Sequence, residues 1–310
     1  MFSKKENEDK YILGISAFYH DSGAALTKNG VVVAAAHEER FTRIKQDSSF
    51  PVNAIKFCLE YSSIDISKLD AVVFYDKPFV KFERLLETYY MFAPEGLRSF
   101  LSAIPVWIKE KLFLKELINK ELKKIQSIHG GEYVRPQLMF SQHHLSHAAS
   151  AFYPSPYKEA AILTIDGVGE WSTASISYGN GKQIKMLREM RFPNSVGFLY
   201  SSFTYFLGFK VNSGEYKLMG LAPYGNVKSE NLKRYKDLIL NEIVKVKDDG
   251  SIWLNQNYFE YCAGLKMINE KKWNKLFGFN RKKEEDVLQQ HHCDLALAIQ
   301  QGSCFKLRFN

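Results

Sequence analysis

Residues 11–36 read YILGISAFYHDSGAALTKNGVVVAAA: three apolar runs, the first two separated by a polar loop and the last two by an Asn-Gly pair. Asn29-Gly30 predicts a tight hairpin, because both central residues of a type I′ turn need positive φ. The same order recurs at residues 160–190, where AAILTI is followed by the loop DGVGEW, the run STASISY, a turn containing Asn180-Gly181 and the run KQIKMLREM. Each copy therefore predicts strand, loop, strand, turn, strand.

Helix-like sequence follows each copy, at residues 52–61 and 196–207, and short apolar runs at 70–76 and 137–140 predict further strands. We therefore expect an α/β protein with two similar halves, 1–158 and 159–310, and an insertion at about 77–131. Two such halves facing each other across a nucleotide or metal cleft form a duplicated actin-like, ribonuclease H-like domain. The alternative is a chance resemblance of two hairpins.

The composition of the 310 residues, 45% hydrophobic and 25% charged, is that of a globular protein and excludes disorder, collagen and coiled coil. No apolar run is long enough to span a bilayer and the N-terminus lacks a signal-peptide pattern, so we expect a cytoplasmic protein without membrane contact. The four cysteines have no CxxC spacing and are expected to be reduced thiols. The net charge is +8, but the lysine-rich stretch 108–124 has leucines at helical spacing, which favours an amphipathic helix over nucleic-acid binding.

The segment 141–152, SQHHLSHAASAF, contains the clearest candidate for a metal site. His143 and His147 stand at i and i+4, so on a helix one metal ion can bridge them; core or capping histidines are the alternative. Asp166 ends the next apolar strand and is followed by Gly167 and Gly169, where the backbone can approach a phosphate or metal closely. Two histidines and an aspartate suit Fe(II), Zn or Mn with open positions, whereas a turn or cap aspartate is the alternative for Asp166.

Three further groups of residues are weaker candidates. His20 and Asp21 can form a general base and its orienting carboxylate, although Asp21 is equally a turn former. Residues 212–225, NSGEYKLMGLAPYG, combine glycines with Lys217 and can hold an anion such as a phosphate. Residues 291–293, His-His-Cys, are expected to be structural, because adjacent residues on a helix point in different directions.

Together these segments resemble the O-carbamoyltransferase family of nodulation-factor and antibiotic-tailoring enzymes. That family is related in its first domain to the universal tRNA threonylcarbamoyladenosine synthase subunit. The matching segments follow the family's order over nearly the first 225 residues. They are GISAFYHDSGAAL (14–26), EERFTRIKQD (38–47), HHLSHAASAF (143–152), LTIDGVGEWSTAS (163–175), FPNSVGFLYS (192–201) and GEYKLMGLAPYG (214–225).

The resemblance implies an actin-like first domain and a second, YrdC-like domain that makes carbamoyl-adenylate from carbamoyl phosphate and ATP. In the first domain a metal, expected to be Fe(II), polarises the carbonyl while a hydroxyl of a small-molecule acceptor attacks. By resemblance, His143, His147 and Asp166 are the metal ligands. Gly214, Glu215 and Lys217 lie near the nucleotide together with Gly167 and Gly169, and His20 with Asp21 deprotonates the acceptor.

Two departures from the family pattern bear on activity. Gln46 stands where the family has a histidine, and the chain ends QQGSCFKLRFN where members continue into a further metal-ligating aspartate and the second domain. We therefore expect a carbamoyltransferase that is incomplete as a single chain. The alternatives are a non-catalytic metal- or nucleotide-binding subunit that needs a separately encoded C-terminal half, and a phosphotransferase on the same actin-like fold.

Overall fold

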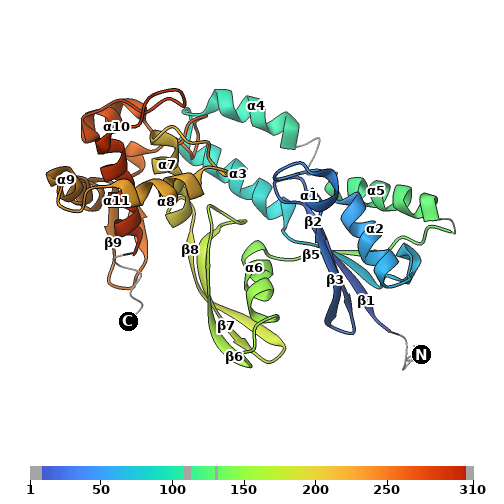
Figure 1. Cartoon of the computed structure of the whole chain (residues 1–310). Helices are drawn as coiled ribbons and strands as arrows, with labels where there is room; N and C mark the ends of the chain where they lie inside the picture. Colours follow the sequence, from blue (N-terminus) through green and yellow to red (C-terminus); the bar gives the residue numbers. More distant parts are fainter. Residues whose placement is uncertain (1–8, 108–112, 130–131, 305–310) are drawn as a thin grey trace. The chain divides into compact units, whose positions relative to one another are not determined.

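The computed structural model describes residues 9–107, 113–129 and 132–304 and shows a mixed α/β fold (Figure 1). The chain divides into two compact units, one made of the residues up to 80 and of 105–146, the other of 81–104 and the residues from 147 onward. This division falls inside a helix, between residues 146 and 147.

The first unit contains a five-stranded sheet with the order β3-β2-β1-β4-β5. β1, β2 and β3 form antiparallel pairs, whereas β4 is parallel to β1 and β5 to β4. The turn between β2 and β3 has positive φ at both Asn29 (53°) and Gly30 (83°), as the sequence predicted. The strands are β1 (Tyr11–Ser16), β2 (Gly23–Lys28), β3 (Val31–His37), β4 (Ala71–Phe74) and β5 (Gln137–Phe140).

Helices α2 (Val52–Tyr61) and α5 (Leu114–His129) bury the apolar side chains of this sheet. α5 is amphipathic as predicted, and the apolar residues it buries are Leu114, Ile118, Leu122 and Ile125. Positions 108–112 of the lysine-rich stretch lie outside the described residues. The short helix α1 (Glu39–Thr42) precedes α2. The N-terminus of α2 is capped by the buried carboxylate of Glu38, which accepts hydrogen bonds from Asn53 N (3.1 Å), Asn53 Nδ2 (2.7 Å) and Ala54 N (2.8 Å).

The second unit contains a three-stranded antiparallel sheet, β6 (Glu159–Ile165), β7 (Ser172–Asn180) and β8 (Gln183–Arg191). Helix α6 (His143–Phe152) covers one face of it, and Phe152 packs so closely over Gly179 that a Cβ there would lie 2.7 Å from the ring. Asn180 pairs with Gln183, so the turn residues are Gly181 and Lys182. Of these two central residues only Gly181 has positive φ (57°), so this turn is not the type I′ turn of the first hairpin.

The helices of the second unit enclose a core centred on Trp273, which phenylalanines contact from several directions. The small hairpin of β9 (Val244–Val246) and β10 (Ile252–Leu254) adjoins it. The helices are α7 (Val196–Phe206), α8 (Glu215–Leu221), α9 (Glu230–Leu238), α10 (Glu270–Phe277) and α11 (Gln290–Cys304), while α3 (Pro78–Phe92) and α4 (Leu97–Trp107) lie in the predicted insertion.

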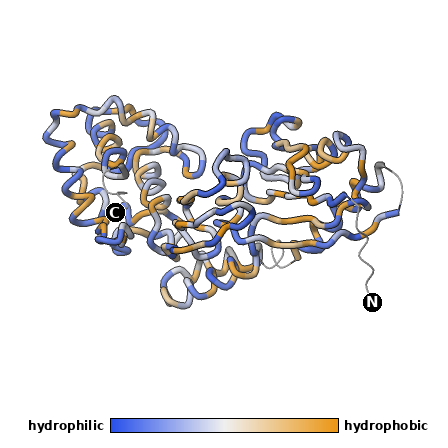
Figure 2. The backbone as a smooth tube through the Cα atoms, turned by 90° about the horizontal axis from the view of Figure 1, so that it is seen from below, coloured by the Kyte–Doolittle hydropathy of each residue, from blue (hydrophilic) through white to orange (hydrophobic). Residues whose placement is uncertain are grey.

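Hydrophobic and hydrophilic residues alternate along most of the chain in Figure 2, as expected for strands and helices with one buried side. Among the described residues, no helix combines the length and the apolar character that crossing a membrane requires.

Candidate metal centre

Helix α6 positions both predicted histidine ligands. His143 is the first residue of the helix and His147 follows one turn later, so the helical repeat alone places them on the same face. The ring of His143 packs on that of Tyr75, with the centroids 5.5 Å apart, and Ser146 Oγ donates to the carbonyl of Tyr75 (2.9 Å). These contacts hold the start of α6 against the residue that follows β4.

Asp166 lies where β6 ends, and the surrounding backbone fixes its place. Its N–H donates to Thr173 O (2.9 Å), and its Oδ1 accepts from the N–H of Gly167 (2.6 Å). Ser195, the N-cap of α7, has its Oγ 2.7 Å from Gly167 O and 3.1 Å from Asp166 O. A Cβ at Gly197 would lie 2.5 Å from Asp166 O, so the first turn of α7 packs directly on the Asp166 loop.

The two histidines and the aspartate meet as predicted. One ligand atom from each of His143, His147 and Asp166 lies within 4.8 Å of the other two, the single such group found in the described part of the chain. His147 Nε2 is 3.9 Å from Asp166 Oδ2, and these side chains are 50% and 31% exposed. Two imidazole nitrogens and a carboxylate oxygen, open to solvent, fit a divalent transition metal that keeps positions for exchangeable ligands.

His20 and Asp21 form a hydrogen-bonded pair. His20 Nδ1 lies 2.8 Å from Asp21 Oδ2, and both side chains are exposed in the loop between β1 and β2. Asp21 has a φ of 49°, a conformation that favours small polar residues in turns. Because the carboxylate accepts from Nδ1–H, Nε2 is left as the nitrogen that can take a proton.

The glycines of the predicted anion-binding segments have packing roles. The ring of Phe198 packs on Gly167, where a Cβ would lie 3.1 Å from Phe198 Cε1. The N–H of Gly169 donates to Ser172 O and closes the loop. At Gly214 a Cβ would lie 2.6 Å from Lys210 O.

The carboxylate of Glu215 is held by its own segment and by helix α7. It accepts from Ser201 Oγ (2.7 Å), Asn212 N (3.0 Å) and Gly214 N (3.2 Å), so it closes the turn that precedes α8. Lys217 is exposed on the same helix. Of this segment, Lys217 is therefore the side chain best placed to meet an anion in solution.

The side chains of His291 and His292 meet, contrary to the expectation from helix geometry. Their Nε2 atoms are 3.1 Å apart. The two residues lie in the first turn of α11, and the Phe279 ring packs against the His291 ring at a tilt of 53° with the centroids 4.4 Å apart. His292 Nδ1 accepts a hydrogen bond from Gln289 N (3.0 Å). The proton of neutral His292 is therefore on Nε2, which donates it to His291 Nε2. Cys58, Cys262 and Cys293 are free thiols, as predicted.

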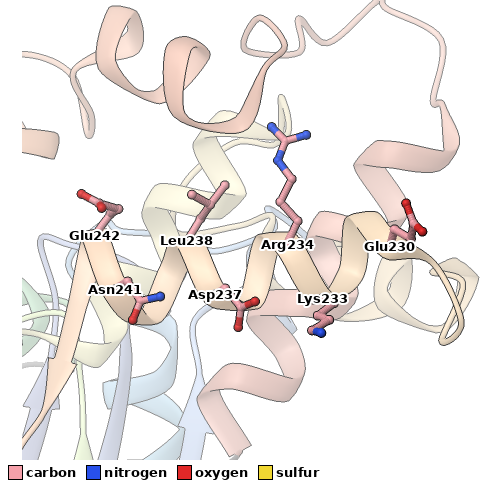
Figure 3. Close-up of a pocket in the computed structure, with 7 residues that line it drawn as sticks. All are labelled: Glu230, Lys233, Arg234, Asp237, Leu238, Asn241 and Glu242. Carbon is pink, nitrogen blue, oxygen red and sulfur yellow. The ribbon is translucent and has the colours of Figure 1, made fainter.

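A cavity of about 480 Å³ lies beside α9 in the second unit (Figure 3). Its side chains fan out from one helix in several directions and carry both signs of charge, so they do not converge on one ligand. None of them is a predicted site residue. The lining residues are Glu230, Lys233, Arg234, Asp237, Leu238, Asn241 and Glu242.

Two parts of the site were not predicted from the sequence, the Ser195 cap and the contact of Gly197 with the Asp166 loop. The available signal was the N-cap pattern itself, a serine directly before the apolar run that begins at Val196.

Comparison with known proteins confirms the family resemblance. The model of the carbamoyltransferase N-terminus family matches residues 11–302. An uncharacterized protein of Synechocystis sp. is 54% identical over 94% of this chain, and the nodulation protein NolNO of Sinorhizobium fredii is 35% identical over 68% of it. The matched regions are 46% and 28% of those two relatives, so the chain spans less than half of either.

Among solved structures, a protein of Pseudomonas aeruginosa similar to the peptidase YEAZ overlaps 58% of this chain and 64% of its own, with a TM-score of 0.28 and 11% identity. That overlap is too low to identify a shared fold.

Proposed function

This chain belongs to the carbamoyltransferase N-terminus family, and from that premise we propose that it binds Fe(II) and transfers a carbamoyl group from carbamoyl-adenylate to a hydroxyl of a small-molecule acceptor. The observation that carries the proposal is the convergence of His143, His147 and Asp166 within 4.8 Å. A phosphotransferase would have no evident use for this set of ligands. We further propose that the two three-stranded hairpin units belong to the two halves of an actin-like domain.

The proposed roles follow from the chemistry of each group. Bound Fe(II) supplies a Lewis acid that withdraws electron density from a carbonyl oxygen. His20 Nε2 accepts the proton of the acceptor hydroxyl, and Asp21 stabilises the resulting imidazolium through Nδ1–H. The acceptor oxygen forms a bond to the carbamoyl carbon, the bond from that carbon to the phosphate oxygen breaks, and AMP leaves with the electron pair.

We assign the nucleotide to the glycine-containing segments. Lys217 offers a solvent-facing cation for a phosphate, while Glu215 and Gly214 hold the turn from which Lys217 projects. Gly167 and Gly169 shape the loop that carries Asp166. In this proposal ATP and carbamoyl phosphate enter only as the source of carbamoyl-adenylate.

The proposal is tested by anaerobic calorimetric titration of the chain with Fe(II). We expect one binding site that is lost in His143→Ala, His147→Ala and Asp166→Ala. His37→Ala is the matched control, because His37 is exposed at the end of β3, outside the three-residue group, and should leave binding intact. With water as the acceptor of the carbamoyl group, the iron-loaded chain should then release AMP from synthetic carbamoyl-adenylate, and His20→Ala should slow this release without changing iron affinity. A folded chain that binds no iron, or that binds it equally well after all three substitutions, refutes the proposal.

A further inference from the structure

Two short segments of the first unit carry backbone strain. In the loop that joins β1 to β2, Phe18 has a φ of 68° and Asp21 has a φ of 49°. In the segment that follows α1, the φ of Arg43 is 61° and that of Gln46 is 55°. Side chains other than glycine rarely adopt this left-handed conformation, because the Cβ crowds the backbone. Residues strained in this way gather at functional sites, where the surrounding contacts hold them in place.

Hydrogen bonds join the two strained segments at both ends of the β1–β2 loop. Phe18 N donates to Ser48 O and Ser22 N donates to Asp47 O, each at 2.8 Å. Two consecutive carbonyl groups of one segment therefore hold the loop on either side of residues 19–21. The side chains of these three residues reach solvent, whereas Ser22 is buried.

The three residues between the two bonds include the proposed general base. His20 Nδ1 lies 2.8 Å from Asp21 Oδ2, and the exposed ring of Tyr19 lies against that of His20 with the centroids 4.6 Å apart. Phe18 instead packs against the core of the first unit, where its ring centroid is 6.0 Å from that of Phe50. The strained loop thus buries one aromatic ring and presents the next two rings to solvent.

The carboxylate of Asp47 fixes the carbonyl groups that hold the loop. Asp47 is 7% exposed; its Oδ1 accepts from Ser49 N (2.9 Å) and its Oδ2 accepts from Thr42 Oγ1 (2.7 Å). The first bond closes an Asx turn over the peptide groups whose carbonyls face the loop, and the second ties this turn to the end of α1. Hydrogen bonds from Ser49 and Thr42 lower the pKa of Asp47, so it accepts both bonds as a carboxylate at neutral pH.

From these contacts we infer that Asp47 is a positioning residue for His20: its carboxylate fixes the two carbonyl groups that hold the strained loop, and the loop keeps the His20 ring against Asp21. The bond from Nδ1–H to Asp21 leaves the lone pair of Nε2 for the acceptor proton. A loop released from these carbonyls can relax its left-handed residues, and the imidazole then carries its proton on either nitrogen. The inference rests on the proposed function for the use of His20, but not for its orientation.

The test reads the tautomer of His20 from the ¹⁵N chemical shifts of its ring, with His20→Ala to assign the signals. The measurement is made at about pH 8.5, where an unperturbed imidazole is neutral. In the wild type the Nδ1–H form should predominate. Asp47→Ala should lower the ratio of the Nδ1–H to the Nε2–H form about tenfold and slow AMP release by the iron-loaded chain roughly tenfold, with unchanged Fe(II) affinity.

Two further variants separate positioning from a general loss of stability. Asp47→Asn should restore most of both readouts, because the amide oxygen can accept from Ser49 N and the amide N–H can donate to the Thr42 hydroxyl. Asp65→Ala is the matched control. Asp65 closes an equivalent turn in the segment before β4 by accepting from Ser67 N (2.8 Å), so its loss should leave both readouts at their wild-type values.

Three results overturn the inference: a wild type whose His20 is mainly Nε2–H, a folded Asp47→Ala chain that keeps the Nδ1–H form, and an equal change in Asp65→Ala. If Asp47→Ala does not fold by circular dichroism, Thr42→Val removes one donor to the carboxylate at nearly constant shape. A partial fall of the tautomer ratio is then expected, and an unchanged ratio overturns the inference. The tautomer is measured without iron or carbamoyl-adenylate, so a wild type that releases no AMP would refute the proposed function alone.

Discussion

The free energy of unfolding should fall as the pH is lowered from 7 to 5, and His292 should cause a defined share of that fall. Burial, with the neighbouring His291 and Lys282, lowers the pKa of His292 to about 4, although Asp286 opposes this shift. A histidine in an unfolded chain has a pKa of about 6.5. Between these two pKa values, His292 is therefore mostly protonated in the unfolded chain and mostly neutral in the folded chain. His292 therefore does not lower the free energy of unfolding above about pH 6.5, and it lowers it progressively as the pH falls from 6.5 towards 4.

The size of the effect follows from the two pKa values. At pH 5 the protonation of His292 in the unfolded chain lowers the free energy of unfolding by about 2 kcal/mol, whereas at pH 7 it lowers it hardly at all. Burial supports a value of this order, because the His292 side chain is only 6% exposed. Protonation would also remove the acceptor that Nδ1 offers to the Gln289 N–H.

The assay is urea denaturation at pH 7 and pH 5, followed by tryptophan fluorescence. Trp273 is a suitable probe, since it is fully buried in the helical core that also includes α11. The comparison is between the wild type and His292→Asn, whose amide oxygen can still accept a hydrogen bond but does not titrate. Equal losses of stability in the two proteins on acidification would refute the reasoning, as would a pKa near 6.5 for His292 measured by NMR.

Three further outcomes are expected. Glu38→Ala should lower the free energy of unfolding by about 3 kcal/mol in urea titrations, because two N–H groups of α2 lose their buried acceptor; a loss below about 0.5 kcal/mol would contradict this capping role. Gly197→Ala should weaken Fe(II) binding roughly tenfold in calorimetry by displacing the Asp166 loop, whereas Gly220→Ala, with open space around it, should not. Cys262, whose pKa burial raises to about 12, should react with iodoacetamide at pH 8 far more slowly than free cysteine, and rapid labelling seen by mass spectrometry would argue against this.

Local patterns in the sequence were sufficient for many of the elements and for placing His143 and His147 on one helix face. Three features depend only on residues close in the chain: the Asn29-Gly30 turn, the strand at 137–140 and the i, i+4 spacing of His143 and His147. Residue preferences and the spacing of residues along the chain are therefore enough to predict them. The convergence of Asp166 with the histidines was predicted from the family resemblance as much as from spacing.

The features that were not predictable depend on contacts between distant residues. The support of the Asp166 loop by Ser195 and Gly197 joins positions about 30 residues apart, and the local N-cap pattern at Ser195 indicates the cap but not this long-range contact. The meeting of His291 and His292 arises because Phe279 and Gln289 orient the rings in the first turn of α11, which overrides the directions expected on a regular helix. The roles of His20, Lys217 and the glycine segments stay predictions.

The AAILTI edge of the three-stranded sheet makes the solubility of the chain depend on how much of it is synthesised. Two copies that meet through this strand collide at a rate that grows with the square of their concentration. A cell that makes the chain in large amounts therefore exposes the strand to aggregation and to chaperones.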